Sequence, residues 1–482
     1  MNITSVSFLL FALAAIVLHG VAARLRMPAL RDLALLAANL YFLSTFAVGG
    51  WNGLLPMACF LALGYAGMRL LHVKQGNARL AAAVLALTLA YFFWVKKYAF
   101  IPGVLLLPHI YMTIGLSYMF FRILQLQIDA ASGNVQQCPG AVAYLNYLLS
   151  FTTLISGPIQ RYEDFAAYRS APLPMTWFAF GRALERIAVG AFKVMVAAAL
   201  LFAWHKQGLI ALQVHASLID KAVNGTAVIS GYTLYLYCNF SGYTDIVIGV
   251  ARFFGNVLPE NFERPFAALN FMDFWARWHM TLSNWLKTYV YNPLVKRTML
   301  RFPSPAVDPY IGVFAFLVTF FLIGLWHGQT FVFALYGLLL GVGVSGNKLY
   351  QVFMTKRLGR KEYRARAAHW LYQACARGIT FTYFCLSLVC FWASWPQIVD
   401  LCGKLGWSGM GAVTAAIFGA ATVLFECWER LRSLALTPAA AGRPLLLSRY
   451  VRTAWFTILV CATAAVTALS ATPAPDIVYK NF

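Results

Sequence analysis

Apolar residues along this chain occur in long runs, which short polar breaks separate from one another. A run of roughly 20 apolar residues is long enough to cross a bilayer as a helix. The runs predict spans at residues 5–22, 30–49, 52–70, 80–98, 103–124, 180–204, 226–253, 308–327, 330–352, 377–396, 407–428 and 450–471. We therefore expect an all-α, polytopic membrane protein with about 11–12 transmembrane helices.

Two further apolar stretches are too irregular to span a bilayer. Residues 143–159 are short and end near Gly157-Pro158, and residues 265–296 are rich in aromatic residues but interrupted by charges. Such segments are tolerated at membrane depth only inside protein or beside a water-filled cavity. We predict re-entrant or interfacial helices here. Because no long polar stretch exists, we expect one integral-membrane domain over residues 1–482.

Composition and charge support the membrane interpretation and exclude nucleic acid as a partner. The chain is 61% hydrophobic and 11% charged, with 38 Lys and Arg against 16 Asp and Glu. The basic residues lie in short gaps between apolar runs, as the positive-inside rule requires. These gaps should face the cytoplasm and anionic lipid, and could attract an acidic cytosolic partner. The N-terminus is then extracytoplasmic. We interpret residues 5–22 as a retained span, since no basic segment precedes it.

The nine cysteines are scattered, mostly within apolar runs, and none form a CxxC pair. No set of them has the spacing of a zinc site. We interpret them as small buried hydrophobic residues and expect no metal site.

His327 is the first candidate for chemistry, because it ends one apolar run just before the next begins at Thr330. Gly324 and Gly328 flank it at helical spacing and would let a helix or a ligand approach the imidazole. A neutral imidazole can accept and return a proton near neutral pH. The alternative is a packing histidine that is hydrogen-bonded to a neighbouring helix.

A second candidate, His279, lies in the aromatic stretch. Apolar residues recur there at three- and four-residue steps, which predicts one continuous helix with an aromatic face: Phe271, Phe274, Trp275, Trp278, Leu282 and Trp285. His279 lies near the edge of that face, beside Ser283, whereas Arg277, Asn284 and Lys287 fall on another. An interfacial anchor explains the aromatic residues but not an adjacent Arg277 and His279.

A third polar group lies inside the predicted span 226–253. Asp245 is costly there unless it is paired or hydrated, and Asn239, Ser241 and Thr244 offer partners. A structural clamp between helices is the simpler role for this group. The segment Pro259–Phe266 follows as a proline-bounded loop that leads into the aromatic helix.

Several of these motifs resemble the membrane-bound O-acyltransferases, especially the bacterial branch that acetylates alginate or exports D-alanine for teichoic acid. The resemblance covers about residues 90–350, with further likeness in the tail DIVYKNF. The motifs are LPHIYMTIGLSYMFFRILQLQIDA at 107–130, LISGPIQRYEDF at 154–165, NFSGYTDIVIG at 239–249, LPENFERPF at 258–266, FWARWHMTLSNWL at 274–286 and LWHG at 325–328.

The resemblance implies a helical ring around a central funnel and tunnel, in the bacterial inner membrane. It implies that His327 is the catalytic histidine and His279 the second histidine, near the other mouth of the tunnel. We place further candidate tunnel or substrate-binding residues at Arg277, Asn284, Ser283, Trp278, Asp245, Asn239 and Trp326. No tightly bound cofactor is expected.

The same resemblance implies a thioester donor, either acetyl-CoA or the phosphopantetheine of a cytosolic acyl carrier protein. The acyl group, most simply acetyl, would cross the membrane to an exported cell-surface polysaccharide. An extracytoplasmic SGNH-type or serine-bearing partner would complete the transfer. D-alanyl transfer to an envelope polymer is the alternative within this class. A transporter or flippase without acyl chemistry, or an inactive subunit of an export complex, are alternatives of other classes.

Overall fold

The computed structural model describes residue 1 and residues 3–436 and 449–469. In these ranges the secondary structure is helical, apart from an isolated bridge between Phe262 and Trp278. The tail DIVYKNF lies outside the described residues. The chain forms two compact units, one of Met1–Ala191 with Gly242–Pro259 and one of Phe192–Ser241 with Glu260–Pro475, which we call unit 1 and unit 2. The prediction of a single integral-membrane domain over residues 1–482 is not tested by this division into two units.

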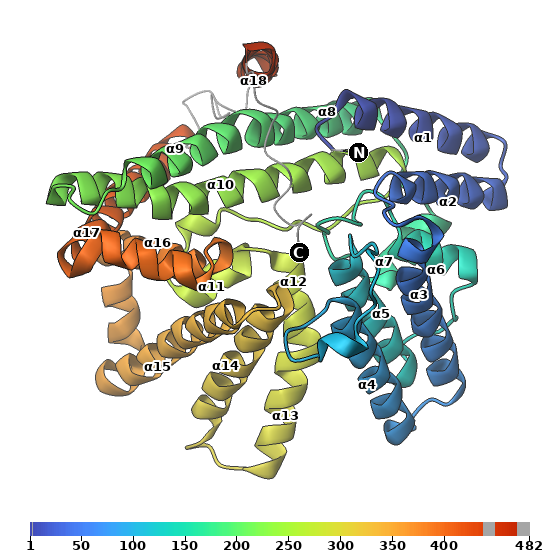
Figure 1. Cartoon of the computed structure of the whole chain (residues 1–482), viewed down its shortest axis with the longest axis horizontal. Coiled ribbons are helices and arrows are strands. Elements are labelled where there is room, and N and C mark those ends of the chain that lie inside the picture. The colour runs from blue at the N-terminus through green and yellow to red at the C-terminus, as the bar shows by residue number, and fades with distance from the viewer. Residues whose placement is uncertain (2, 437–448, 470–482) are drawn as a thin grey trace. The chain divides into compact units, whose positions relative to one another are not determined.

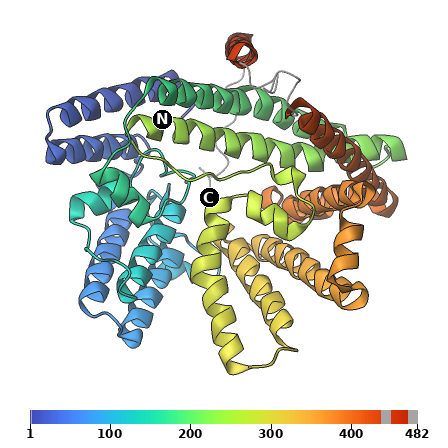
Figure 2. The same ribbon diagram turned by 180° about the vertical axis from the view of Figure 1, so that it is seen from behind.

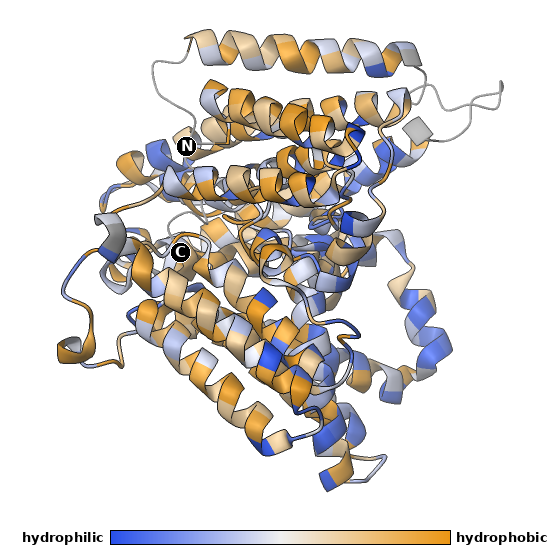
Figure 3. Ribbon diagram, turned by 90° about the vertical axis from the view of Figure 1, so that its right-hand side faces the viewer, coloured by the Kyte–Doolittle hydropathy of each residue, from blue (hydrophilic) through white to orange (hydrophobic). Residues whose placement is uncertain are grey.

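Nine helices of the described part are long and apolar enough to cross a membrane. They correspond to nine of the twelve predicted spans, and the other three differ for separate reasons. The predicted span 30–49 corresponds to a helix of only 17 residues, Pro28–Ser44. The predicted span 226–253 lies in the long helix Leu218–Phe253, which carries polar side chains. The prediction of a span at 103–124 was wrong, because regular α-helix begins only at Leu116. Figure 3 shows hydrophobic residues predominating along the long helices.

Unit 1 contains the N-terminal helices, and α1 and α2 lie side by side in it (Figures 1 and 2). Side-chain caps start several of its helices: Ser5 accepts from the Phe8 amide and Asn77 from that of Leu80. Its helices are α1 (Val6–Arg24), α2 (Pro28–Ser44), α3 (Gly50–Val73), α4 (Ala78–Val95), η1 (Gly103–Leu105), α5 (Leu116–Ala131), α6 (Ala141–Leu148), α7 (Tyr162–Ser170) and most of α8 (Trp177–Phe192).

The core of unit 1 forms around α5, which is buried on nearly every face. Its Arg122 is fully buried, and the guanidinium donates to backbone carbonyls of α6 and the loop after it, those of Tyr147, Leu148, Thr153 and Pro158. A buried guanidinium is costly unless its donors are satisfied. Arg122 thus ties the segment 147–158 to α5. The short α6, followed by this non-helical segment, confirms that residues 143–159 do not span a bilayer.

Unit 2 contains the second half of the chain and both candidate histidines. The π-helical turn η2 (Lys193–Ala197) and α9 (Ala198–Ala211) open it, and α10 (Leu218–Phe253) passes from unit 2 into unit 1 at Gly242. The remaining helices are η3 (Pro265–Ala267), α11 (Phe271–Arg277), α12 (Met280–Leu286), η4 (Lys287–Tyr291), α13 (Asn292–Arg301), α14 (Asp308–His327), α15 (Phe331–Ala367), α16 (Trp370–Trp392), α17 (Trp395–Leu436) and α18 (Arg449–Leu469).

Candidate active site

His327 is the last residue of α14, and only 4% of it is exposed. Aromatic rings enclose the imidazole, with centroid separations of 4.6 Å to Trp326, 5.8 Å to Tyr336 of α15 and 5.1 Å to Phe391 of α16. Gly328 leaves the helix in an extended conformation, and α15 starts three residues later. The imidazole therefore lies at a helix end, in a site that excludes bulk water.

Glycines fix the approach of α15 to α14 beside His327. A Cβ on Gly337 would lie 2.7 Å from the carbonyl oxygen of Phe321, and one on Gly324 would collide with the Gly337 backbone. Real Cβ atoms do not come this close, so the crossing requires glycine at both positions. A Cβ on Gly328 would collide with the ring of Phe333. The prediction that Gly324 and Gly328 permit a close approach is confirmed, and the approaching element is α15.

The aromatic helix expected over residues 271–287 is interrupted at His279, so the prediction of a continuous helix was wrong. Trp278 is extended, and His279 has a left-handed backbone (φ 45°, ψ 50°) between α11 and α12. The backbone at this break forms hydrogen bonds with the loop at 261–263. The Glu263 amide donates to the Arg277 carbonyl, and the Met280 amide donates to the Asn261 carbonyl. Pairing with this loop stabilises a conformation that is uncommon for a residue with a Cβ.

Asn261 fixes both the position and the tautomer of His279. Its Oδ1 accepts hydrogen bonds from the Thr281 amide (3.2 Å) and the Thr281 hydroxyl (2.8 Å), which identifies this atom as the amide oxygen. The same oxygen lies 3.1 Å from His279 Nδ1. Because a carbonyl oxygen can only accept, Nδ1 must carry the proton. In the neutral imidazole, Nε2 is then the nitrogen with the lone pair.

Burial lowers the pKa of His279 to about 3, and this residue lies outside the helices that could cross the membrane. Desolvation is the largest cause, since the charged imidazolium is disfavoured in a low-dielectric site. The ring also packs edge-on against Phe240 of α10, at 4.9 Å between centroids. His279 is therefore neutral over the physiological pH range.

Helix α16 contacts the surroundings of both histidines. Trp278, which precedes His279, packs against Phe384 at 4.9 Å, and His327 packs against Phe391 at 5.1 Å. Phe384 and Phe391 are seven residues apart, which is two helical turns or about 10.5 Å along the axis. The surroundings of the two histidines thus contact aromatic residues of the same helix, α16, two turns apart.

Three other candidate residues around the helix break are more exposed than His279. Arg277 forms an ion pair with Asp273 one turn earlier, at 2.8 Å, and both side chains are about 30% exposed. Asn284 is exposed, and Ser283 is half-buried, with its amide donating to the His279 carbonyl. These contacts place Arg277 and Ser283 in the local structure around His279, and Asn284 at the surface.

The polar residues of α10 belong to two different units. Asp245 lies in unit 1, where its carboxylate accepts from Arg186 Nε of α8 at 3.1 Å. This pairing agrees with the expected clamp between helices, although the partner is an arginine that the sequence did not indicate. Asn239 is fully buried and lies in unit 2.

A model of the membrane-bound O-acyltransferase family, MBOAT, matches residues 2–386. The chain belongs to this family. The match includes both histidines, the break between α11 and α12, and the crossing of α14 with α15. Membership confirms the expected all-α, multi-pass membrane fold and the expected class of enzyme, an O-acyltransferase.

Three bacterial relatives are named as acyltransferases or an acetylase of teichoic acid, alginate or peptidoglycan. The teichoic acid D-alanyltransferase of Bacillus subtilis is 28% identical over 285 residues, which cover 58% of this chain and 68% of the relative. The probable alginate O-acetylase of Pseudomonas aeruginosa is 30% identical over 234 residues, covering 48% and 42%. The peptidoglycan O-acetyltransferase of Helicobacter pylori is 42% identical over 120 residues, covering 25% and 21%.

The alignments thus span about two thirds of the Bacillus relative and less than half of the other two. Within the described ranges, no three His, Cys, Asp or Glu side chains are grouped so that they could hold a metal ion.

Sequence reasoning missed Asn261 as a site residue of this MBOAT chain. It identified Pro259–Phe266 only as a loop, because the contact with His279 joins residues 18 positions apart through a non-helical segment. Helical periodicity carries no information about such a contact. A buried asparagine beside prolines in an apolar chain was the available signal, since buried amides require several hydrogen bonds.

Proposed function

We propose that this chain moves an acyl group, in the first instance acetyl, from a cytosolic thioester to a hydroxyl of an exported cell-surface polysaccharide. The observation that carries the proposal is the buried imidazole of His327 within the segment that the O-acyltransferase family model matches. The resemblance assigns this residue as catalytic, and its enclosure by rings supports that role. A general base in such a site can act on a hydroxyl without exposing the thioester to bulk water.

In the proposed reaction, the His327 imidazole removes the proton from the acceptor hydroxyl as its oxygen attacks the thioester carbonyl. A C–O bond forms, and the C–S bond breaks when the tetrahedral intermediate collapses. The thiolate leaves and takes the proton from the imidazolium, so that the histidine is neutral again. The donor is acetyl-CoA or the phosphopantetheine of an acyl carrier protein. No tightly bound cofactor is required by these steps.

His279 has a positioning role in this scheme, at the acceptor side of the tunnel that the resemblance implies. Asn261 Oδ1 lies 3.1 Å from Nδ1 and keeps the proton on that nitrogen, so the imidazole is held in one tautomer and one orientation beside the tunnel. Its low pKa keeps this imidazole neutral at neutral pH. In this scheme His279 acts on the entry of the acceptor, and His327 acts on its hydroxyl.

We place the protein in the bacterial inner membrane with its N-terminus outside the cytoplasm. The basic gaps after α1, after α3 and in the second half of α15 support this orientation. An extracytoplasmic SGNH-type or serine-bearing acyltransferase would then receive the acyl group, and an acyl carrier protein could deliver it from the cytosol.

D-alanyl transfer to an envelope polymer is the second candidate, because the Bacillus D-alanyltransferase shares the longest of the three reported alignments. The same chemistry at His327 serves either acyl group. The two candidates differ in the acyl donor and in the acceptor polymer, and an assay with both thioesters separates the donors.

The test uses the purified full chain in lipid vesicles with radiolabelled acetyl-CoA and D-alanyl-phosphopantetheine carrier protein. We expect transfer or slow hydrolysis of one thioester by the wild type, and its loss in His327→Ala. His215→Ala, at an exposed loop position of unit 2, is the matched control and should keep wild-type activity. Full activity of a well-folded His327→Ala would contradict the proposal, and transport of a substrate without acyl transfer would favour the transporter alternative.

A further inference from the structure

Unit 1 contains a cavity of about 50 Å³ that the acyl-transfer scheme does not use. Segments of α1, α2, α6, α7 and the end of α10 surround it. The polar residues that matter for its chemistry are His19, Arg31, Asp32, Ser150, Tyr168 and Arg169. A single water requires roughly 10–15 Å³, so the space holds several waters or the oxygens of one small anionic group.

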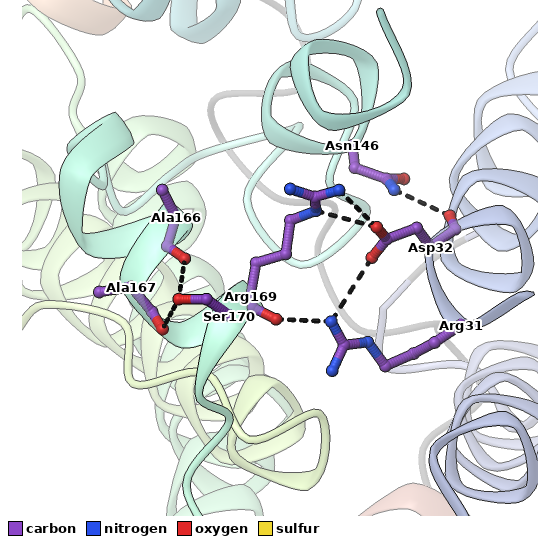
Figure 4. A network of polar contacts seen from close by, with 7 residues as sticks. All are labelled: Arg31, Asp32, Asn146, Ala166, Ala167, Arg169 and Ser170. Carbon is purple, nitrogen blue, oxygen red and sulfur yellow. Dashed lines mark hydrogen bonds and ion pairs between the residues drawn. The ribbon is translucent and has the colours of Figure 1, made fainter. Parts of the chain in front are cut away.

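Two arginines converge on one carboxylate at this cavity (Figure 4). Arg169 of α7 donates to Oδ2 of Asp32 through Nε at 3.0 Å and Nη2 at 2.6 Å. Arg31 Nη2 lies 3.8 Å from Asp32 Oδ1 and donates to the backbone carbonyl of Arg169 at 2.5 Å. Asn146 of α6 donates to the Asp32 backbone carbonyl at 2.8 Å. The network therefore holds both guanidinium groups in place before any ligand arrives.

The charges of this network do not balance, because one carboxylate faces two guanidinium groups. A guanidinium has five N–H donors in a fixed plane. Among the described residues, Nε and Nη2 of Arg169 and Nη2 of Arg31 donate hydrogen bonds within the network. The remaining guanidinium nitrogens, Nη1 of both side chains and Nε of Arg31, can donate to a ligand. Tyr168 and Ser150, which each carry a hydroxyl group, also line the space. This donor set suits a tetrahedral anion such as a phosphate group.

Arg169 is the most exposed of the three charged residues at the cavity. Its side chain is 39% exposed, whereas those of Asp32 and Arg31 are 10% and 14% exposed. Exposed apolar residues occupy the same two helices that supply His19 and Arg31, namely Val17, Leu18 and Val21 on α1 and Leu30 and Leu33 on α2. Because α1 is long and apolar enough to cross the bilayer, these side chains are suited to contact acyl chains.

We propose that this cavity of unit 1 binds the phosphate of an anionic phospholipid headgroup, with Arg31 and Arg169 as ligands and Asp32 as the residue that positions them. The acyl chains of the lipid lie along the exposed apolar surface of α1 and α2. The proposal is independent of acyl transfer, since it concerns other residues in the other unit. A soluble phosphate ester shares the headgroup chemistry but lacks the chains, so the two sources are separable.

The experiment measures binding of fluorescent phosphatidylglycerol to the delipidated full chain in detergent. The variants are Arg31→Gln, which leaves the pair of Arg169 with Asp32 intact, and Arg169→Gln. Arg182→Gln is the matched control, because Arg182 pairs with Glu185 on α8 and does not line the cavity. Thermal unfolding of each variant verifies that it is folded.

Removal of a charged hydrogen-bond donor should raise the Kd for phosphatidylglycerol by about tenfold or more in both cavity variants. Arg182→Gln should bind like the wild type. A diacylglycerol with the same chains should bind far more weakly, and 10-fold molar excess of inorganic phosphate over lipid should not displace the lipid. Equal Kd values for Arg31→Gln and Arg182→Gln would overturn the proposal. So would tight binding of diacylglycerol, or displacement by inorganic phosphate, which would indicate a site for soluble phosphate esters.

Discussion

His279 and His327 are both buried in unit 2, but different features hold them in place. His279 lies at a break between two short helices, where the side-chain oxygen of Asn261 accepts a hydrogen bond from Nδ1–H and the backbone is left-handed. His327 lies at the end of a 20-residue helix, where three aromatic rings and a glycine crossing surround it. A hydrogen bond with Asn261 orients the first imidazole, and aromatic rings beside a close helix crossing enclose the second.

This difference suits two different tasks. A histidine whose tautomer is fixed by an amide oxygen presents one defined lone pair, which favours orienting a substrate hydroxyl. A histidine placed by packing at the end of a long helix is kept at a fixed depth and away from water, which favours proton transfer in a protected site. Single substitutions at and around the two histidines can separate these tasks.

The largest effect should come from removing the two imidazoles one at a time. His327→Ala should lower acyl transfer by about 10²–10⁴-fold, the usual contribution of general acid–base catalysis. His279→Ala should lower it less, mainly by raising KM for the acceptor, because the residue orients rather than reacts. Steady-state kinetics with a labelled thioester measures both. A greater loss of kcat in His279→Ala than in His327→Ala would reverse the two roles.

The packing that places His327 should be sensitive to a single methyl group. Gly337→Ala brings a Cβ to 2.7 Å from the Phe321 carbonyl and forces α14 and α15 apart, at a cost of about 1–3 kcal/mol. Gly346→Ala is the matched control on the same helix, because its Cβ would meet nothing within 4 Å. It should stabilise α15 by about 0.5–1 kcal/mol. Thermal unfolding in detergent should move the two midpoints in opposite directions.

The hydrogen bonds of Asn261 should matter for His279 and not for His327. Asn261→Ala removes the acceptor of three contacts and leaves a buried imidazole N–H unsatisfied, which costs about 1–3 kcal/mol. Asn261→Asp keeps an acceptor oxygen and should recover part of the activity, while its negative charge raises the pKa of His279. The acidic limb of the pH–activity profile should then shift upward in Asn261→Asp alone. Equal losses in both variants, with an unchanged profile, would show a purely structural role.

The burial of His279 also predicts how the free energy of unfolding changes with pH. Its pKa is about 3 when folded and 6.5 when exposed, so below pH 6.5 the unfolded chain binds a proton that the folded chain does not. Stability from this residue is complete above pH 6.5 and falls as the pH drops toward 3. Between pH 7 and pH 5 the loss is about 2 kcal/mol. His279→Gln should therefore lose less stability than the wild type over that interval, and equal losses would mean that His279 is protonated in the folded state.

The long elements of this fold could be predicted from the sequence, whereas the local geometry around His279 could not. Apolar runs identified His327 at the end of a span, because about 20 apolar residues leave few alternatives to a helix. The same reasoning took residues 271–287 as one helix, since the aromatic positions keep helical spacing across Trp278 and His279. Hydrogen bonds from the loop at 261–263 outweigh that local preference, and no periodic signal records them.

The partners of the charged residues in unit 1 could not be predicted from the sequence either. Asp245 was recognised as costly in an apolar helix, but its partner Arg186 lies 59 positions earlier in another helix. The network of Arg31, Asp32 and Arg169 joins residues 137 positions apart. A sequence identifies which buried charges need partners, and the tertiary structure decides which partners they meet.

The smallest effect should come from Arg277, which lies two residues before His279 in the sequence. Its ion pair with Asp273 is of the i,i+4 type, and both side chains are about 30% exposed. Such pairs contribute roughly 0.2–0.5 kcal/mol. Arg277→Gln should therefore leave the unfolding midpoint nearly unchanged and acyl transfer within about twofold of the wild type. Arg186→Gln, which removes the partner of the more buried Asp245, is the contrasting variant and should destabilise unit 1 more. A loss of activity in Arg277→Gln beyond tenfold, without loss of stability, would instead place this guanidinium at the reacting carbonyl.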